Sequence, residues 1–207
     1  KNDYSIGKTK ISVPPTLLYS VIGKIPDVRK AVTMDAKRPQ DLVYVLGETR
    51  DELGGSEWFA QHNAVGNKVP QVDAKKAMRL YRALSQAIRA GLVASCHDCS
   101  DGGLAVALAE TAFAGGLGLN VDLKDVPYRG KKRDDYILFS ETASRFVVTV
   151  RPQDKTKFDK RMKGNVAREI GFVTGDGLMQ VSGLSGKTII QEKIGKLKEA
   201  WQKPLNF

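Results

Sequence analysis

Residues 102–114, GGLAVALAETAFA, predict a helix that is apolar on nearly every side. A helix that is hydrophobic all round is stable in water only when it is buried, so the fold must enclose this segment. Residues 92–95, LVAS, predict a strand before it, and residues 117–123, LGLNVDL, alternate between apolar and polar as a strand does. The order of these elements indicates a helix packed on a sheet.

The preceding part of the chain repeats this order of strand and helix. Residues 42–47, LVYVLG, predict a short strand that is buried on both faces. Residues 73–91 predict an amphipathic helix in which Asp73 is the N-cap and Gly91 is the end. We expect its apolar face to consist of Ala77, Tyr81, Leu84 and Ile88. The whole succession is β-α-β-α-β.

The second half of the chain predicts a different arrangement. Residues 145–150 predict a strand, and a helix begins at Pro152 with Phe158 and Met162 on its apolar side. Residues 167–183 predict a hairpin that turns at 175–177. The terminal helix is predicted by helical spacing of the apolar residues Ile190, Ile194, Leu197 and Trp201. Strand, helix, hairpin and terminal helix resemble a ferredoxin-like half and favour the α+β class over a doubly wound sheet.

The first 26 residues have a character of their own. Pro14 and Pro15 exclude a helix, and residues 16–25, TLLYSVIGKI, predict an extended strand. The chain also starts at Lys1 without a methionine, so we expect it to be part of a longer protein.

Composition excludes several classes of protein. Hydrophobic residues make up 42% and charged residues 27%, which is typical of a soluble globular domain. No apolar run approaches the ~18 residues that a membrane helix needs. The net charge of +10 divides into +5 for residues 1–40, −3 for 41–127 and +8 for 128–207. Without a recognition module or a basic stripe with aromatic residues, it indicates a solvated lysine-rich surface rather than nucleic-acid binding.

The CHDC stretch at residues 96–99 suggests a metal site, but the rest of the chain does not support one. A structural zinc site usually has four ligands, and His62 is the only other histidine or cysteine. The surroundings also differ from those of a thioredoxin-like redox pair. Two cysteines are too few for a disulfide-built fold and are typical of a reduced, cytosolic compartment. We therefore expect no metal ligands here.

Two glycine-containing stretches precede predicted helices. Ser56 after Gly54 and Gly55 can cap a short helix, and Ser100 or Asp101 before Gly102 can do the same. The same stretches can instead bind phosphate through free backbone N–H groups. Spacing alone leaves both interpretations open, as it does for Glu141 in LFSE, which is either a solvated acid or a residue that faces a cleft.

Four stretches, in this order, resemble one family: PPTLLYSVIGKIPDV, ELGGSEW, SCHDCSDGGLAVALAE and LFSE. The family is that of the synthetase subunits of phosphoribosylformylglycinamidine synthase, within the superfamily related to aminoimidazole ribonucleotide synthetase. GGSE followed by HDxSDGGL and LFSE favours this family over the others in the superfamily. The resemblance implies a three-layer α/β/α C-terminal domain with partial ferredoxin-like topology.

The resemblance also implies a position in the longer protein. Residues 1–26 would be the extended tail of a preceding nucleotide-binding domain, and residues 27–207 the second C-terminal domain. The family's magnesium-binding acids and best-known catalytic histidine would lie upstream, so we assign no catalytic residue and expect the fragment alone to be inactive. The candidate ligand- or phosphate-binding residues are Gly54, Gly55, Ser56, His97, Asp98, Ser100, Asp101, Gly102, Gly103 and Glu141.

The implied activity is an ATP-dependent ligase reaction of purine biosynthesis in the cytoplasm. Formylglycinamide ribonucleotide, ATP and ammonia from glutamine would give formylglycinamidine ribonucleotide, ADP, phosphate and glutamate. ATP and Mg²⁺ would be bound mainly by the upstream domains, at an active or an auxiliary nucleotide site. The implied partners are the rest of the synthetase chain, a glutaminase subunit and a small bridging subunit, without nucleic acid or membrane. The alternatives are a non-catalytic assembly or binding module, and a related ATP-using enzyme of the selenophosphate or thiamine-phosphate type.

Overall fold

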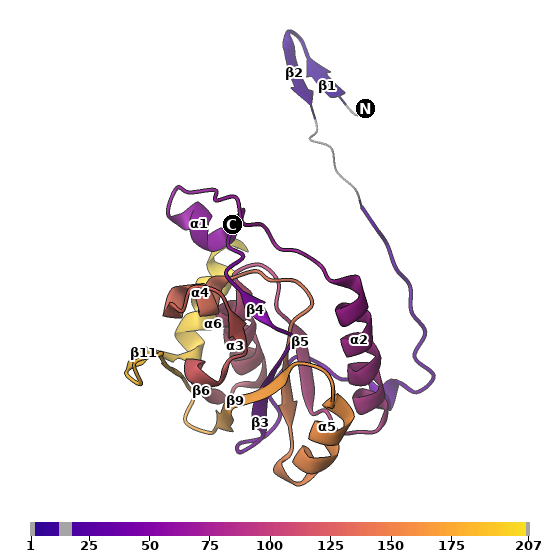
Figure 1. The fold of residues 1–207 in the computed structure, drawn as a ribbon. Helices are drawn as coiled ribbons and strands as arrows, with labels where there is room; N and C mark the ends of the chain where they lie inside the picture. The colour runs from indigo at the N-terminus through magenta and orange to yellow at the C-terminus, as the bar shows by residue number, and fades with distance from the viewer. Residues whose placement is uncertain (1–2, 13–17, 206–207) are drawn as a thin grey trace. The chain divides into compact units, whose positions relative to one another are not determined.

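The computed structural model describes residues 3–12 and 18–205 (Figure 1). The contacts divide the chain into two units, Lys1–Ala31 and Val32–Phe207. This division falls a few residues after the predicted end of the tail at residue 26. The assignment of the first unit to a preceding nucleotide-binding domain stays a prediction.

The first unit contains a small hairpin. Strand β1 (Asp3–Ile6) pairs with β2 (Thr9–Ser12) in antiparallel register, and a short 3₁₀ helix, η1 (Val28–Lys30), follows later. The strand predicted at 16–25 is wrong for residues 18–25, which form no strand, while 14–17 lie outside the described residues. A strand needs a neighbour to accept its hydrogen bonds, and this unit supplies none to 18–25. The apolar side chains there are exposed: Leu18, Tyr19, Val21, Ile22 and Ile25.

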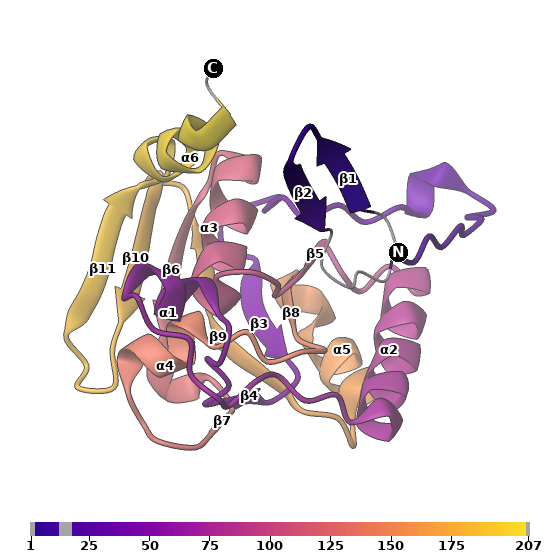
Figure 2. The ribbon, with the colours of Figure 1, turned by 90° about the horizontal axis from the view of Figure 1, so that it is seen from above.

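The second unit is built on a mixed sheet, which within its described residues has seven strands in the order β11-β10-β6-β9-β3-β8-β5 (Figure 2). The strands are β3 (Leu42–Leu46), β5 (Ser95–Asp98), β6 (Gly118–Asp122), β8 (Phe146–Val150), β9 (Ala167–Thr174), β10 (Leu178–Ser182) and β11 (Thr188–Lys193). A short parallel pair, β4 (Thr49–Arg50) with β7 (Tyr128–Arg129), stands apart from it.

The two halves of the chain interleave in this sheet. Strands β3, β5 and β6 of the first half share one direction, but none of them is next to another. Strands β8 and β9 of the second half lie between them and pair antiparallel with both neighbours. The α+β class and the partial ferredoxin-like character are therefore confirmed, and the sheet is not doubly wound.

Helices cover both faces of the sheet and complete the predicted three layers (Figure 2). Helices α2 (Ala74–Arg89) and α5 (Lys155–Met162) pack on one face, and α3 (Gly103–Gly115), α4 (Asp134–Phe139) and α6 (Ile194–Gln202) pack on the other. The remaining helical segments are α1 (Glu57–Gln61), η2 (Leu123–Asp125), η3 (Pro152–Asp154) and η4 (Lys203–Leu205).

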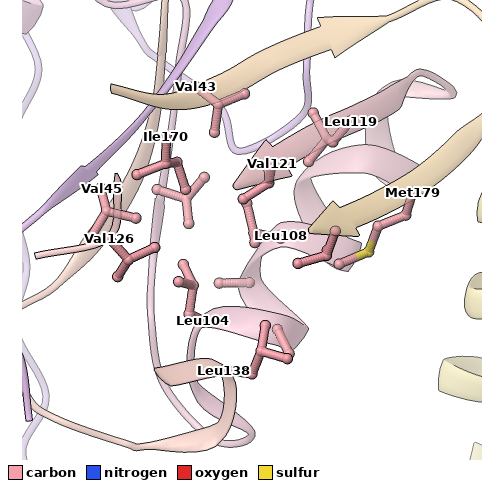
Figure 3. Packing of buried hydrophobic residues seen from close by; sticks show 14 of the residues in the cluster. Val43, Val45, Leu104, Leu108, Leu119, Val121, Val126, Leu138, Ile170 and Met179 are labelled. Carbon is pink, nitrogen blue, oxygen red and sulfur yellow. The ribbon is translucent and has the colours of Figure 1, made fainter. Parts of the chain in front are cut away.

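Helix α3 is the centre of the larger core (Figure 3). Leu104 and Leu108 are completely buried, as the apolar sequence predicts. Alternation along β3 separates the two cores: Val43 and Val45 join the α3 cluster, whereas Tyr44 and Leu46 join the α2–α5 cluster. None of the described helices is both long enough and apolar enough to span a membrane.

The predicted hairpin over 167–183 is wrong. Strands β9 and β10 are not paired, because β6 lies between them and pairs with both. The short connection at 175–177 passes the start of β6 at Gly118. A Cβ on Gly118 would stand 2.3 Å from Thr174 Oγ1 and 2.4 Å from Asp176 Oδ1. Because glycine has no side chain, β6 can lie between β9 and β10.

Three further predictions need correction. The terminal helix begins only at Ile194, because the β-branched segment 188–193 pairs with β10 as β11. The strand predicted at 92–95 is β5 at 95–98, next to β8. In α2, Ala77 and Leu84 are buried as predicted, but Tyr81 is exposed, and the apolar face instead includes Leu80 and Ala87.

Candidate functional site

The Glu141 carboxylate joins the two glycine-containing loops. Its Oε1 atom accepts one hydrogen bond from the N–H of Glu57 at 3.0 Å and another from the N–H of Gly102 at 2.8 Å. Glu57 is the first residue of α1, and Gly102 is the N-cap of α3. One half-buried oxygen therefore accepts from both helix starts, where the helix dipoles also favour a negative charge.

In the first loop, the backbone N–H groups are already engaged. Gly54 donates to the carbonyl of Lys68 at 2.9 Å, and Gly55 donates to that of Val65 at 2.7 Å. The hydroxyl of Ser56 accepts from the N–H of Phe59 at 3.2 Å, so Ser56 caps α1 as predicted. This loop is built as a helix start and leaves neither glycine N–H free for a phosphate.

The second loop follows β5 and leads into α3. The sequence suggests Ser100 or Asp101 as the N-cap of α3, but neither residue caps the helix. The N-cap is Gly102, which adopts a left-handed conformation and makes no side-chain hydrogen bond. The hydroxyl of Ser100 instead donates to Asp98 Oδ2 at 2.6 Å. The N–H groups of Ser100 and Asp101 have no acceptor among the described residues, so they remain available to a ligand.

Gly103 packs directly on the segment that leads to Glu141. A Cβ at this position would stand 2.4 Å from the carbonyl oxygen of Ser140 and 2.9 Å from that of Leu138. Its φ of +64° also lies in the left-handed region, which favours glycine. Glycine at position 103 thus allows the start of α3 to lie directly against the backbone of residues 138–140.

His97 and its neighbour Asp98 have different main partners, although His97 Nδ1 lies 3.6 Å from Asp98 Oδ1. Successive strand residues point to opposite faces, and His97 points toward α3 and α6. Its Nε2 atom lies 2.6 Å from Glu110 Oε2, and the other Glu110 oxygen accepts from the indole N–H of Trp201 at 2.8 Å. The structure therefore places His97 in a link between β5, α3 and α6, apart from Glu141.

Beside Glu141 there is an open hollow of about 690 Å³. Three carboxylates and one cation contribute to its lining, which includes Asp98, Ser100, Asp101, Glu141, Tyr81, Ser144 and the buried Arg145. Carboxylates accept hydrogen bonds from hydroxyl or amino groups and repel a bare phosphate. The described residues contain no group of three or more His, Cys, Asp or Glu that could hold a metal ion.

Sequence reasoning missed Arg145, which is only 1% exposed. Its guanidinium donates to the carbonyls of Ser140 and Thr142 and to Thr49 Oγ1. Burial lowers the pKa of Arg145, while nearby negative groups, Glu52 among them, act in the opposite direction. The only signal in the sequence is an arginine directly before a strand that is apolar except for Thr149.

The two cysteines are free thiols rather than a reactive pair: Cys99 is buried in the α3 cluster, and Cys96 is half-buried against the α2–α5 cluster. Burial raises the pKa of the Cys96 thiol to about 12 and also raises that of Cys99. Because the thiolate is the nucleophile, we expect iodoacetamide at pH 8.5 to alkylate the native chain at least about tenfold more slowly than the urea-unfolded chain. Mass spectrometry measures both rates, and equal rates would contradict the buried positions.

Comparison with known proteins places the chain in a family. Residues 38–183 match the model for the AIR synthase related protein, C-terminal domain. The chain belongs to this family. The match covers the strands and loops around Glu141.

Two similar curated proteins bear the name of the same enzyme subunit. The chain is 38% identical over 93% of its length to the phosphoribosylformylglycinamidine synthase subunit PurL of Alkaliphilus metalliredigens, and 40% identical over 96% to that of Thermobifida fusca. It spans about a quarter of these relatives, 26% and 25% respectively.

Two solved structures show the same fold at lower identity. Thermotoga maritima PurL complexed with FGAR superposes with a TM-score of 0.70 at 22% identity, over 82% of this chain and 30% of that one. The hydrogenase maturation protein HypE in complex with ATP superposes with a TM-score of 0.56 at 15% identity, over 80% of this chain and 55% of that one. Both share the fold of this chain.

Proposed function

We propose that this chain is the second C-terminal domain of a phosphoribosylformylglycinamidine synthase synthetase subunit. In this function it contributes one wall of a cleft in which formylglycinamide ribonucleotide, ATP and ammonia are converted to formylglycinamidine ribonucleotide, ADP and phosphate. The 38–40% identity to PurL subunits over nearly the whole chain supports the assignment. The observation that carries the site is the Glu141 carboxylate shared between two helix starts.

The chemistry of this wall follows from its free groups. The unoccupied N–H groups of Ser100 and Asp101 can donate to a ligand oxygen, and Asp98 and Asp101 can accept from ribose hydroxyls. Glu141 holds the two loops at one spacing, which prepares the wall before the ligand arrives. The other candidate residues shape the loops. Gly54 and Gly103 lie too close to neighbouring backbone for a side chain, Gly55 and Gly102 adopt positive φ angles, and Ser56 caps α1.

Other components are part of the same proposal. The carboxylates around the hollow repel a bare triphosphate, whose charge must be neutralised by other groups. We therefore assign Mg²⁺ and the positive groups that neutralise the phosphates to the upstream part of the synthetase. A glutaminase subunit that supplies ammonia, a small bridging subunit and a cytoplasmic location complete the assignment.

Replacement of Glu141 tests the site in the complete synthetase. Glu141→Gln keeps the shape but replaces a charged acceptor by a neutral one, and hydrogen bonds to charged groups are about twice as strong. We expect KM for ATP or for the ribonucleotide to rise about tenfold. Steady-state kinetics provide the measurement, with Glu199→Gln on the exposed side of α6 as the matched control. Unchanged constants for Glu141→Gln would contradict the proposed site.

The isolated chain provides a complementary measurement. Calorimetric titration of residues 1–207 with ATP and with formylglycinamide ribonucleotide should show weak or no binding, and no amidine should form, because the chain supplies one wall of the cleft. Robust ATP-dependent amidine formation by the isolated chain would show that the division of labour proposed here is wrong.

A further inference from the structure

Arg145 is a buried charge for which the proposed reaction has no direct use. Its side chain is among the largest of the fully buried side chains in the described residues, and it lies directly before β8. A buried guanidinium is costly unless its donors are satisfied, so its partners indicate why the fold retains it.

Those partners lie on both sides of Glu141. Nε donates to the carbonyl of Thr142 at 2.9 Å, and Nη2 donates to the carbonyl of Ser140. These are the residues immediately after and before Glu141. The guanidinium therefore holds the backbone on either side of the residue whose carboxylate joins the two loops.

Further contacts join the segment 140–142 to residues 49–52. Nη1 of Arg145 donates to Thr49 Oγ1 at 3.0 Å, and the N–H of Glu141 donates to the carbonyl of Glu52 at 3.2 Å. Glu52 is itself a buried carboxylate, 5% exposed, with no hydrogen-bond partner for Oε2 in the described part of the chain. The backbone of Glu141 is thus anchored to the segment 49–52, which leads into the first glycine loop.

We propose that Arg145 is a positioning residue, which sets the place of the Glu141 carboxylate and thereby the spacing of the two ligand-facing loops. Its guanidinium donors are engaged by Ser140, Thr142 and Thr49, so it acts on the loops through Glu141, although the residue also contributes to the lining of the hollow. The inference rests on the proposed function, since its effect on activity depends on those loops forming the cleft wall.

The geometry requires arginine rather than any buried cation. The planar fork of a guanidinium donates in two fixed directions at once, which matches two carbonyls that flank one residue. A lysine carries the same charge on a single rotatable ammonium and cannot reproduce that pair of directions. Arg145→Lys therefore keeps the charge and removes the positioning.

The test uses the complete synthetase with Arg145→Lys, Glu141→Gln and the double variant. We expect each single variant to raise the same KM about tenfold, and the double variant to be no worse than the worse single, because both changes remove one function. Phe158→Leu, in the α2–α5 core, serves as a control that loses thermal stability without reaching the loops. It should leave that KM unchanged.

The outcomes separate this inference from the proposed function. If Glu141→Gln has no effect, the proposed site fails. If Glu141→Gln raises KM but Arg145→Lys does not, or if the two effects multiply in the double variant, Arg145 has a structural role only. If Arg145→Lys is not recovered folded, Thr49→Val removes one anchor of the guanidinium. A rise of about threefold in the same KM would then support the inference, and an unchanged KM would overturn it.

Discussion

Replacement of Gly103 by alanine should destabilise the second unit by about 2–5 kcal/mol, through two additive effects. A left-handed φ costs a non-glycine residue about 1–2 kcal/mol. The new Cβ would also stand 2.4 Å from the carbonyl oxygen of Ser140, which is backbone and cannot rotate away. Overpacking of this kind typically costs a further amount of about 1–3 kcal/mol. Urea unfolding followed by circular dichroism measures the loss.

The same helix supplies a matched control at its other end. Gly116 has a φ of +66°, nearly the same as the +64° of Gly103, but a Cβ added to Gly116 would have no atom within 4 Å. Gly116→Ala should therefore lose only the backbone cost of about 1–2 kcal/mol. Equal losses for the two variants would show that the close approach of Gly103 to the 138–140 backbone contributes nothing.

Phe158→Ala should cost about 3–5 kcal/mol because it empties the centre of the α2–α5 core. Phe158 is completely buried and meets the ring of Tyr44 edge to face, with centroids 5.0 Å apart. The cavity would also remove support from Tyr44, whose hydroxyl donates to Asp159 and accepts from Lys155 at 2.9 Å each. The midpoint of urea unfolding should fall accordingly.

Met78→Ala is the appropriate comparison in the same layer. Met78 lies on α2 and is 50% exposed, so its removal should change stability by no more than about 0.5 kcal/mol. A loss below about 1 kcal/mol for Phe158→Ala would mean that the core collapses around the missing ring, or that α5 contributes little to folding.

Much of the local structure could be predicted from the sequence, because short-range chemistry determines it. Asp73 caps α2 and Ser56 caps α1, each through its own side chain. The apolar segment at 103–115 is the buried helix α3. The candidate residues around Glu141 were identified by motif, and their assignment to a ligand site stays a proposal.

The predictions that failed concerned partners distant in sequence. The 167–183 segment has a good turn signal, but whether its strands pair depends on β6, which enters between them. His97 and Asp98 are neighbours in the chain, yet the pleat of β5 gives their side chains different hydrogen-bond partners, Glu110 for His97 and Ser100 for Asp98. A periodic pattern contains no information about which strand lies alongside.

The sequence by itself determined the caps of α1 and α2, which helix is buried, and which family the motifs resemble, because caps, periodicity and glycine positions act over a few residues. Only the tertiary structure decided which charged side chains lie together and which distant residues are hydrogen-bonded. Residues 73–91 and 151–165 hold eleven basic and three acidic residues, +8 of the net +10, and they meet in one layer only because α2 packs against α5. Likewise, Arg145 and Glu141 gain their roles from carbonyls and N–H groups that folding brings within hydrogen-bond distance.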